Sequence, residues 1–206
     1  MKIFFRITIF AVLFTLSCQL QSQNRFGAYG GASLTGLSDG VLSNITVNPP
    51  LGIHLGALYE WELSEKIAFR PKVAFSQQGD REDSQVGTTF GSFALDYKLT
   101  YLNVPLQFKF FSQPYFLAGP QIGYLLSIDK GDVDAGNLDS SFDYGVSVGI
   151  GYDIDPFFME LTFYQGLSTL ITTPDGALPL GGTDDLTNQV FQVSVGYYFT
   201  KKKKRR

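Results

Sequence analysis

The chain has 206 residues, of which 44% are hydrophobic and 15% aromatic, and its formal net charge at pH 7 is −3. It contains one cysteine, Cys18, and one histidine, His54. These counts exclude a disulfide framework and a cysteine metal site from the chain beyond residue 18. They also leave His54 alone as an imidazole base.

Residues 1–22 are predicted to form a secretory signal peptide. Lys2 and Arg6 precede an apolar run over 7–16, and small and polar residues follow that run. The run is too short to span a bilayer as a helix, and its flanks are those of a cleaved leader. Lipidation of Cys18 is an alternative, although Thr15 stands where a lipoprotein signal prefers leucine. We therefore expect an exported protein.

The rest of the chain alternates apolar with small or polar side chains, and a period of two predicts strands. Residues 141–154 show the alternation most clearly, because even positions are large and apolar while odd positions are Gly, Ser or Asp. Only the first strand, which is rich in glycine, does not show which of its faces is apolar. Eight strands are predicted, at about 24–35, 50–62, 67–78, 95–111, 115–127, 141–154, 157–170 and 189–200.

The face opposite the apolar one carries mainly small residues, whereas a soluble sheet would present Lys, Glu and Thr to water. Small residues save volume inside a narrow lumen, so we expect the apolar face to contact lipid. Charged residues of both signs fall on the inward face, where they must pair or be hydrated. The predicted lumen charges, with the single histidine, are Arg25, His54, Glu60, Glu62, Arg70, Lys72, Lys109, Asp143, Asp153 and Glu160.

The connections alternate in length. Those after the second, fourth and sixth strands are short, at 64–66, 112–114 and 155–156, and the others are long, at 36–49, 79–94, 128–140 and 171–188. Short periplasmic turns and long extracellular loops are typical of outer-membrane barrels. The sequence therefore predicts an all-β fold, an eight-stranded antiparallel transmembrane up-and-down β-barrel over residues 23–200.

Aromatic residues gather where the strands meet the short turns, which predicts a girdle at the periplasmic headgroup layer. The predicted girdle comprises Tyr59, Trp61, Phe110, Phe111, Tyr115, Phe116, Tyr152, Phe157, Phe158, Tyr197 and Phe199.

Two segments, YLNVPLQFK at 101–109 and PYFLAGPQIGY at 114–124, resemble the small porin-like, PorT-like outer-membrane β-barrel domain family of Gram-negative bacteria. The closing VGYYF at 195–199 is similar to the terminal strand that the barrel-insertion machinery recognises in such proteins. Members usually stop at that aromatic, whereas this chain continues through a basic tail at 201–206. The resemblance covers essentially the whole exported chain and implies a fold and a location rather than one activity.

Eight strands enclose a lumen that side chains just fill, so we expect a plugged barrel, with a narrow polar channel as the alternative. No serine motif accompanies His54, and we expect a non-enzymatic protein with no catalytic residue and no cofactor. An envelope-structural or surface-interaction role is predicted. A porin-like channel for small solutes and an accessory role in an outer-membrane secretion system are the alternatives.

The long loops are strongly acidic, since only Arg81 and Lys130 oppose their eleven acids. Residues 129–139 resemble a calcium loop but fail the EF-hand register, so no metal site is assigned and only weak, unspecific cation binding is conceivable. Of the sixteen basic residues, six lie in the tail and two in the leader, which leaves eight against nineteen acidic ones. The acids of the long loops are Asp39, Asp80, Glu82, Asp83, Asp129, Asp132, Asp134, Asp139, Asp175, Asp184 and Asp185.

The expected partners follow from this placement. They are outer-membrane lipid and lipopolysaccharide, the barrel-insertion machinery, and an extracellular or periplasmic protein. Export excludes nucleic acid as a partner of the basic tail, which in the periplasm could contact the anionic inner leaflet.

Overall fold

The computed structural model describes residues 24–38, 51–80, 97–111, 113–130, 141–169, 171–172 and 185–200. The predicted signal peptide, the basic tail and most of the long loops lie outside these residues, and what was expected of them stays a prediction. Across the described ranges, no helix is both long and apolar enough to cross a membrane. The strands are β1 (Arg25–Ser38), β2 (Leu51–Glu62), β3 (Ile67–Asp80), β4 (Tyr97–Phe110), β5 (Tyr115–Lys130), β6 (Phe142–Ile154), β7 (Phe157–Gly166), β8 (Ile171–Thr172) and β9 (Asp185–Tyr198).

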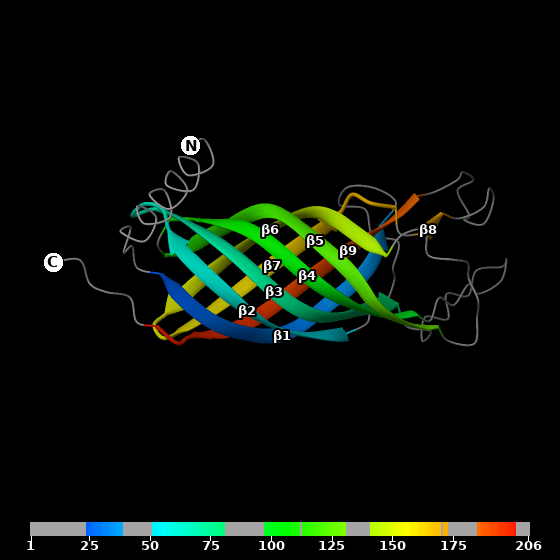
Figure 1. Ribbon diagram of the computed structural model, residues 1–206, viewed down its shortest axis with the longest axis horizontal. Coiled ribbons are helices and arrows are strands. Elements are labelled where there is room, and N and C mark those ends of the chain that lie inside the picture. Colours follow the sequence, from blue (N-terminus) through cyan, green and yellow to red (C-terminus); the bar gives the residue numbers. More distant parts are fainter. Residues whose placement is uncertain are drawn as a thin grey trace, which may run out of the picture.

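Each long strand pairs antiparallel with its neighbours in the chain, and β1 pairs with β9 to close the sheet. The β1–β9 ladder runs from Gly27 opposite Tyr198 to Ser38 opposite Thr187. The two-residue strand β8 extends the wall by pairing with the first residues of β9. Figure 1 shows the tilted strands wrapped around one axis. The predicted closed, eight-stranded antiparallel barrel is confirmed.

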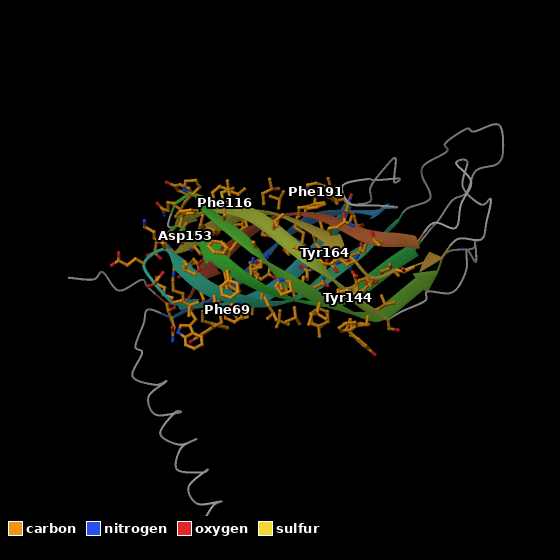
Figure 2. The ribbon with its side chains drawn as sticks, turned by 90° about the horizontal axis from the view of Figure 1, so that it is seen from above. Phe69, Phe116, Tyr144, Asp153, Tyr164 and Phe191 are labelled. Atoms are coloured by element: carbon orange, nitrogen blue, oxygen red, sulfur yellow. The ribbon has the colours of Figure 1, made fainter. Side chains whose placement is uncertain are left out.

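Side chains alternate between the outer and inner faces of this wall. In β6, Val148 is 44% exposed while its neighbour Ser147 is 2% exposed, and the alternation holds along the whole strand. Phe116 and Phe191 point away from the barrel in Figure 2, and large apolar residues of every long strand share this exposure. An apolar belt of this extent is stable only against lipid.

Burial shows which face of β1 points inward, which the sequence did not. Arg25, Tyr29 and Ser33 are buried, so the odd positions of β1 point inward. Gly31 shares this parity and lies between Ser194 of β9 and His54 of β2 in the two ladders. A Cβ at Gly31 would collide with the backbone carbonyl of Val193. Glycine is therefore required at this position of β1, opposite the Val193 carbonyl of β9.

The seventh strand ends at Gly166, four residues earlier than predicted, and β9 begins at Asp185, four residues earlier than predicted. Pairing between β7 and β9 ends at Gln165 opposite Gln189. Beyond that point the Leu167 N–H still donates to the Tyr144 carbonyl of β6. The chain then turns inward, because the Ser168 hydroxyl donates to Asp143 Oδ1 at 2.6 Å. A local contact with the lumen thus overrides the strand pattern.

Two members of the predicted aromatic girdle face inward instead. Tyr115 and Phe158 are both 0% exposed, because each lies on the inward parity of its strand and its ring fills the lumen. Of the remaining members, Phe110 is half-buried. The members that are exposed, as a girdle requires, are Tyr59, Trp61, Phe111, Phe116, Tyr152, Phe157, Tyr197 and Phe199.

Replacing Val148 by arginine places a charge at the middle of the lipid-facing side of β6. We expect Val148→Arg to lower the free energy of unfolding by about 2–4 kcal/mol. The control, Ser147→Ala, removes one buried hydrogen bond, the 2.6 Å donation from Gln107 Nε2, and should cost about 1 kcal/mol. Urea unfolding of the purified barrel in detergent measures both. Equal losses would mean that the inner and outer faces are interchanged.

Candidate functional site in the barrel lumen

The lumen contains two chemically different layers. A charged plug occupies the end where short turns connect the strands, and a polar chamber occupies the end where the long connections begin. Figure 2 shows Asp153, a plug residue, and Tyr164, a chamber residue, toward opposite ends of the barrel. The charged plug is Arg25, Glu60, Arg70, Lys72, Lys109, Asp153 and Glu160, and all seven residues are buried. The polar chamber is Gln78, Tyr101, Asn103, Asp143, Tyr164 and Asn188, which are buried too.

The two arginines join strands on opposite sides of the plug. Arg70 Nη1 of β3 lies 2.5 Å from Glu160 Oε1 of β7, and its Nε lies 3.7 Å from Glu60. Arg25 Nη1 of β1 lies 3.3 Å from Asp153 Oδ2 of β6. Its Nη2 lies 2.8 Å from Asp155 at the half-exposed rim. Guanidinium groups suit this position because one planar fork can contact two carboxylates.

The two lysines complete the network. Lys72 Nζ donates to Glu160 Oε2 at 2.6 Å. Lys109 Nζ donates to Asp153 Oδ2 at 2.7 Å and to Glu60 Oε2 at 3.2 Å. Together with Asp155 at the rim, four cations face four carboxylates. The plug is therefore close to electrically neutral, as burial of charge requires.

Aromatic side chains contact the charged groups of the plug. The Tyr198 hydroxyl donates to Glu60 Oε2 and the Tyr115 hydroxyl donates to Glu160 Oε1, each at 3.0 Å. The Arg25 guanidinium lies 3.3 Å from the centre of the Tyr198 ring, and Arg70 lies 4.7 Å from that of Phe158. Such contacts hold cations without solvent. The inward positions of Tyr115 and Phe158 therefore have a physical reason.

The predicted lumen network is thus observed, with three qualifications. Glu62 is half-buried and Asp143 belongs to the chamber rather than to the plug. His54 stands apart, because its Nε2 lies 2.8 Å from Ser194 Oγ. No motif could have indicated this pair, since the two residues are 140 positions apart and meet only because β1 closes on β9.

The His54–Ser194 pair lacks the third member of a catalytic triad. His54 Nδ1 has no hydrogen-bond partner among the residues that the structure describes. Both side chains are buried. A nucleophilic serine needs a base whose orientation is held by a third group and a path for substrate. The geometry supports a structural hydrogen bond between β2 and β9.

Hydroxyls and amides line the polar chamber. Asp143 accepts hydrogen bonds from Ser168 Oγ at 2.6 Å and from Asn188 Nδ2 at 3.2 Å. Asn188 Nδ2 also donates to Gln78 Oε1 at 2.7 Å. Within the described ranges, no cluster of three or more His, Cys, Asp or Glu residues is arranged to hold a metal ion.

Neutralising Glu160 tests the plug. Glu160→Gln keeps the side-chain volume but leaves Arg70 and Lys72 without their shortest ion pairs, so we expect a loss of about 3–5 kcal/mol in unfolding free energy. The measurement is urea unfolding followed by gel mobility and by the emission of Trp61. Glu65→Gln, an exposed carboxylate of the β2–β3 turn, is the matched control and should change stability little. A loss no larger than that of Glu65→Gln would contradict the network.

Comparison with known proteins agrees with this architecture. Residues 19–172 match the family described as an outer membrane protein beta-barrel domain. Among solved structures, Neisserial surface protein A has a TM-score of 0.50 at 14% identity, with 84% of this chain and 97% of that chain covered. No curated protein sequence matches.

Two further solved structures are similar to the chain. OprG of Pseudomonas aeruginosa has a TM-score of 0.47 at 15% identity, covering 87% of this chain and 97% of that one. Ail, the attachment invasion locus protein of Yersinia pestis, has a TM-score of 0.46 at 14% identity, covering 86% of this chain and 99% of that one. At these identities, the likeness to Neisserial surface protein A is a likeness of fold alone. A family match over most of the chain and a closed barrel with an apolar belt agree, and the chain belongs to the outer membrane protein beta-barrel domain family and resides in the cell outer membrane.

Proposed function

We propose that the protein is a non-enzymatic, non-conducting barrel that supports the envelope or interacts at the cell surface through its acidic extracellular loops. The charged plug is the observation that carries this proposal. Its ion pairs join β1, β2, β3, β4, β6 and β7 across the lumen. A path for solutes would have to separate these pairs, and each separation leaves a buried charge without a partner.

The width of the barrel supports the same conclusion. An eight-stranded barrel has a lumen that side chains just fill, and here Arg70, Tyr115 and Phe158 are completely buried inside it. A porin needs a continuous polar lumen, and this layer interrupts it with rings and paired charges. A porin-like channel is therefore the less favoured function, and an accessory role in an outer-membrane secretion system stays an alternative.

The long loops are the part of the chain that we expect to determine its partner. Their eleven acids lie outside or at the edge of the described residues, so their role rests on sequence. Beside anionic lipopolysaccharide, such loops repel unless divalent cations bridge the two. We propose lipopolysaccharide with bridging cations, or a basic protein surface, as the partner. Membership of the small porin-like, PorT-like group remains part of this proposal.

Planar-bilayer recordings test the plug directly. We expect no steady single-channel conductance from the wild-type protein. The double variant Arg70→Ala/Glu160→Ala removes the pair that joins β3 to β7, takes from Lys72 its ion pair with Glu160, and should give measurable openings. Ser147→Ala, which leaves the plug intact, should stay silent.

A steady conductance from the wild-type barrel would overturn the non-conducting role in favour of a narrow channel. Silence from the double variant, with the wild type silent too, would mean that the rest of the lumen closes the barrel without this ion pair.

Substitution of the terminal aromatic, Phe199, tests the expected contact with the insertion machinery. The Phe199 N–H donates to the Phe26 carbonyl at 2.8 Å, and its ring packs 5.6 Å from that of Phe26. We expect Phe199→Ala to impair assembly, because the final strand loses its ring at the headgroup layer. Deletion of 201–206 should leave assembly intact. The readout is the fraction of heat-modifiable protein in the outer-membrane fraction.

Phe111→Ala is the matched control, because Phe111 and Phe199 are equally exposed, at 58%. If Phe111→Ala assembles normally, the defect of Phe199→Ala belongs to the terminal strand and not to the loss of one ring. Failure of the tail deletion, with normal assembly of Phe199→Ala, would instead assign targeting or partner binding to the basic residues.

A further inference from the structure

A small pocket, here called the rim pocket, opens at the end of the barrel where short turns connect the strands. It lies between the β2–β3 turn and the end of β4. Its volume is about 20 Å³, and a space above about 15 Å³ admits one group of the size of a water molecule. The Phe111 N–H donates to the Lys66 carbonyl at 2.7 Å and so joins the two walls. An ammonium group fits a space of this size.

Carboxylates outnumber cations around the rim pocket. Glu60, Glu62 and Glu65 line it, together with two bases, Lys66 and Lys109. Lys109 Nζ already donates to two carboxylates of the charged plug, one of them Glu60, so these charges are balanced within the plug. On the outer side, Glu62 and Glu65 face the single base Lys66. Both acids also contact other groups of the barrel, and one more positive charge would balance this part of the rim.

The basic tail starts at the same end of the barrel. Figure 1 shows the end of β9 at the end of the barrel where β2 turns into β3. The Phe26 N–H of β1 donates to Thr200 Oγ1 at 3.1 Å, and Thr200 Oγ1 donates to the Asn24 carbonyl at 3.4 Å. These bonds hold the residue before the tail against the start of β1. Arg25 of β1 is in turn the ladder partner of Glu60 on β2, so the tail begins one strand away from the nearest wall of the pocket.

Six residues are long enough to reach the pocket. Neighbouring strands are about 4.8 Å apart, so a path from β1 across β2 and β3 covers about 15 Å. An extended chain of six residues spans about 20 Å. Every residue of 201–206 is a lysine or an arginine, and the tail therefore presents a cation to the pocket at whichever position reaches it.

We propose that the basic tail, residues 201–206, docks in the rim pocket and straps the end of β9 to the β2–β3 turn. One lysine of the tail places its ammonium group between Glu62 and Glu65. The strap crosses β1 and so holds the seam at which the barrel closes. It forms only after β1 and β9 have paired, which agrees with the expectation that assembly does not need the tail.

This inference goes beyond the proposed surface role and is independent of it. The strap lies at the opposite end of the barrel from the acidic loops. Conductance tests the charged plug, whereas the position of the tail tests the rim pocket. Either proposal can therefore fail without the other.

Paramagnetic broadening in NMR spectra of the full chain locates the tail. The protein is held in dodecyl maltoside, a detergent without charge, and the variant Cys18→Ser/Lys204→Cys carries one nitroxide on the tail. We expect the backbone amides of Ser64, Lys66 and Phe111, at the pocket, to lose most of their intensity.

The β6–β7 turn is the internal control. Phe157, which follows this turn, is the ladder partner of Tyr197 on the other side of β9. A tail without a preferred site would therefore broaden the Asp155 amide at least as strongly as the amides at the pocket. Equal broadening of the two sides, or broadening of the β6–β7 turn alone, would overturn the proposal.

Neutral variants test the charges. Glu62→Gln/Glu65→Gln keeps the side-chain volumes and should abolish the preference for the pocket. Asp155→Asn, the matched control, removes a rim carboxylate on the other side of β9 and should leave the preference unchanged. Sodium chloride at about 1 M should also abolish the preference, because it shortens the screening length to about 3 Å. If the double variant does not fold, Glu65→Gln alone, at an exposed position, should weaken the preference.

A repeat in bicelles that contain phosphatidylglycerol sets the pocket against anionic lipid headgroups, which also attract basic segments. Broadening that stays at the pocket supports the strap. Loss of that broadening in the bicelles would assign the tail to the lipid surface and overturn the proposal. A preference for the pocket that survives in a folded Glu62→Gln/Glu65→Gln barrel would overturn it too.

Discussion

The pairing of β1 with β9 is the constraint on which the rest of the structure depends. Inside a bilayer no water can satisfy a free backbone N–H or carbonyl, so a sheet must have no open edge. The β1–β9 ladder removes both edges at once, over twelve residue pairs. Closure then divides every strand into a lipid side and a lumen side, and it limits the lumen to the width that eight strands allow.

The narrow lumen explains why charge and aromatic rings occur together in the plug. Each arginine or lysine must be desolvated to fit, and that cost is recovered only if carboxylates and hydroxyls surround it. Glu60 illustrates the arrangement, because it contacts Arg25, Arg70, Lys109 and the Tyr198 hydroxyl at once. Such a network ties six strands to one another through their side chains, in addition to the hydrogen bonds of the wall. Side chains therefore fill the half of the lumen that lies next to the short turns.

The half of the lumen next to the long connections is built differently. Amides and hydroxyls replace the ion pairs, and at Gly123, Gly145 and Gly166 the neighbouring atoms pack too closely to leave room for a side chain. Asp143 lies at the centre of this layer with neutral donors around it. The hydrogen bond from Ser168 to Asp143 lies just beyond the end of β7. The strand therefore ends at Gly166, earlier than the alternating pattern of the sequence predicts. The lumen is therefore closed by ion pairs near the short turns and lined by neutral polar groups near the long connections.

Much of the fold follows from the sequence, because the period of a strand is local. Parity alone places Ser147 inside and Val148 outside, and it predicts the inward direction of Arg70 and Glu160 before any contact is known. The same rule, applied to Tyr115 and Phe158, would have placed both rings in the lumen. Their nearness to the short turns suggested a girdle instead, and this prediction was wrong.

Only the tertiary structure decided which inward groups meet. Arg25 and Asp153 are 128 positions apart, and His54 and Ser194 are brought together by the closure of β1 on β9. Strand periodicity says which face a residue takes but not its height along the barrel, because tilt and stagger arise when all strands pair. The partners of each buried charge, and the lone carboxylate of Asp143 among them, are therefore properties of the closed barrel and not of any single strand.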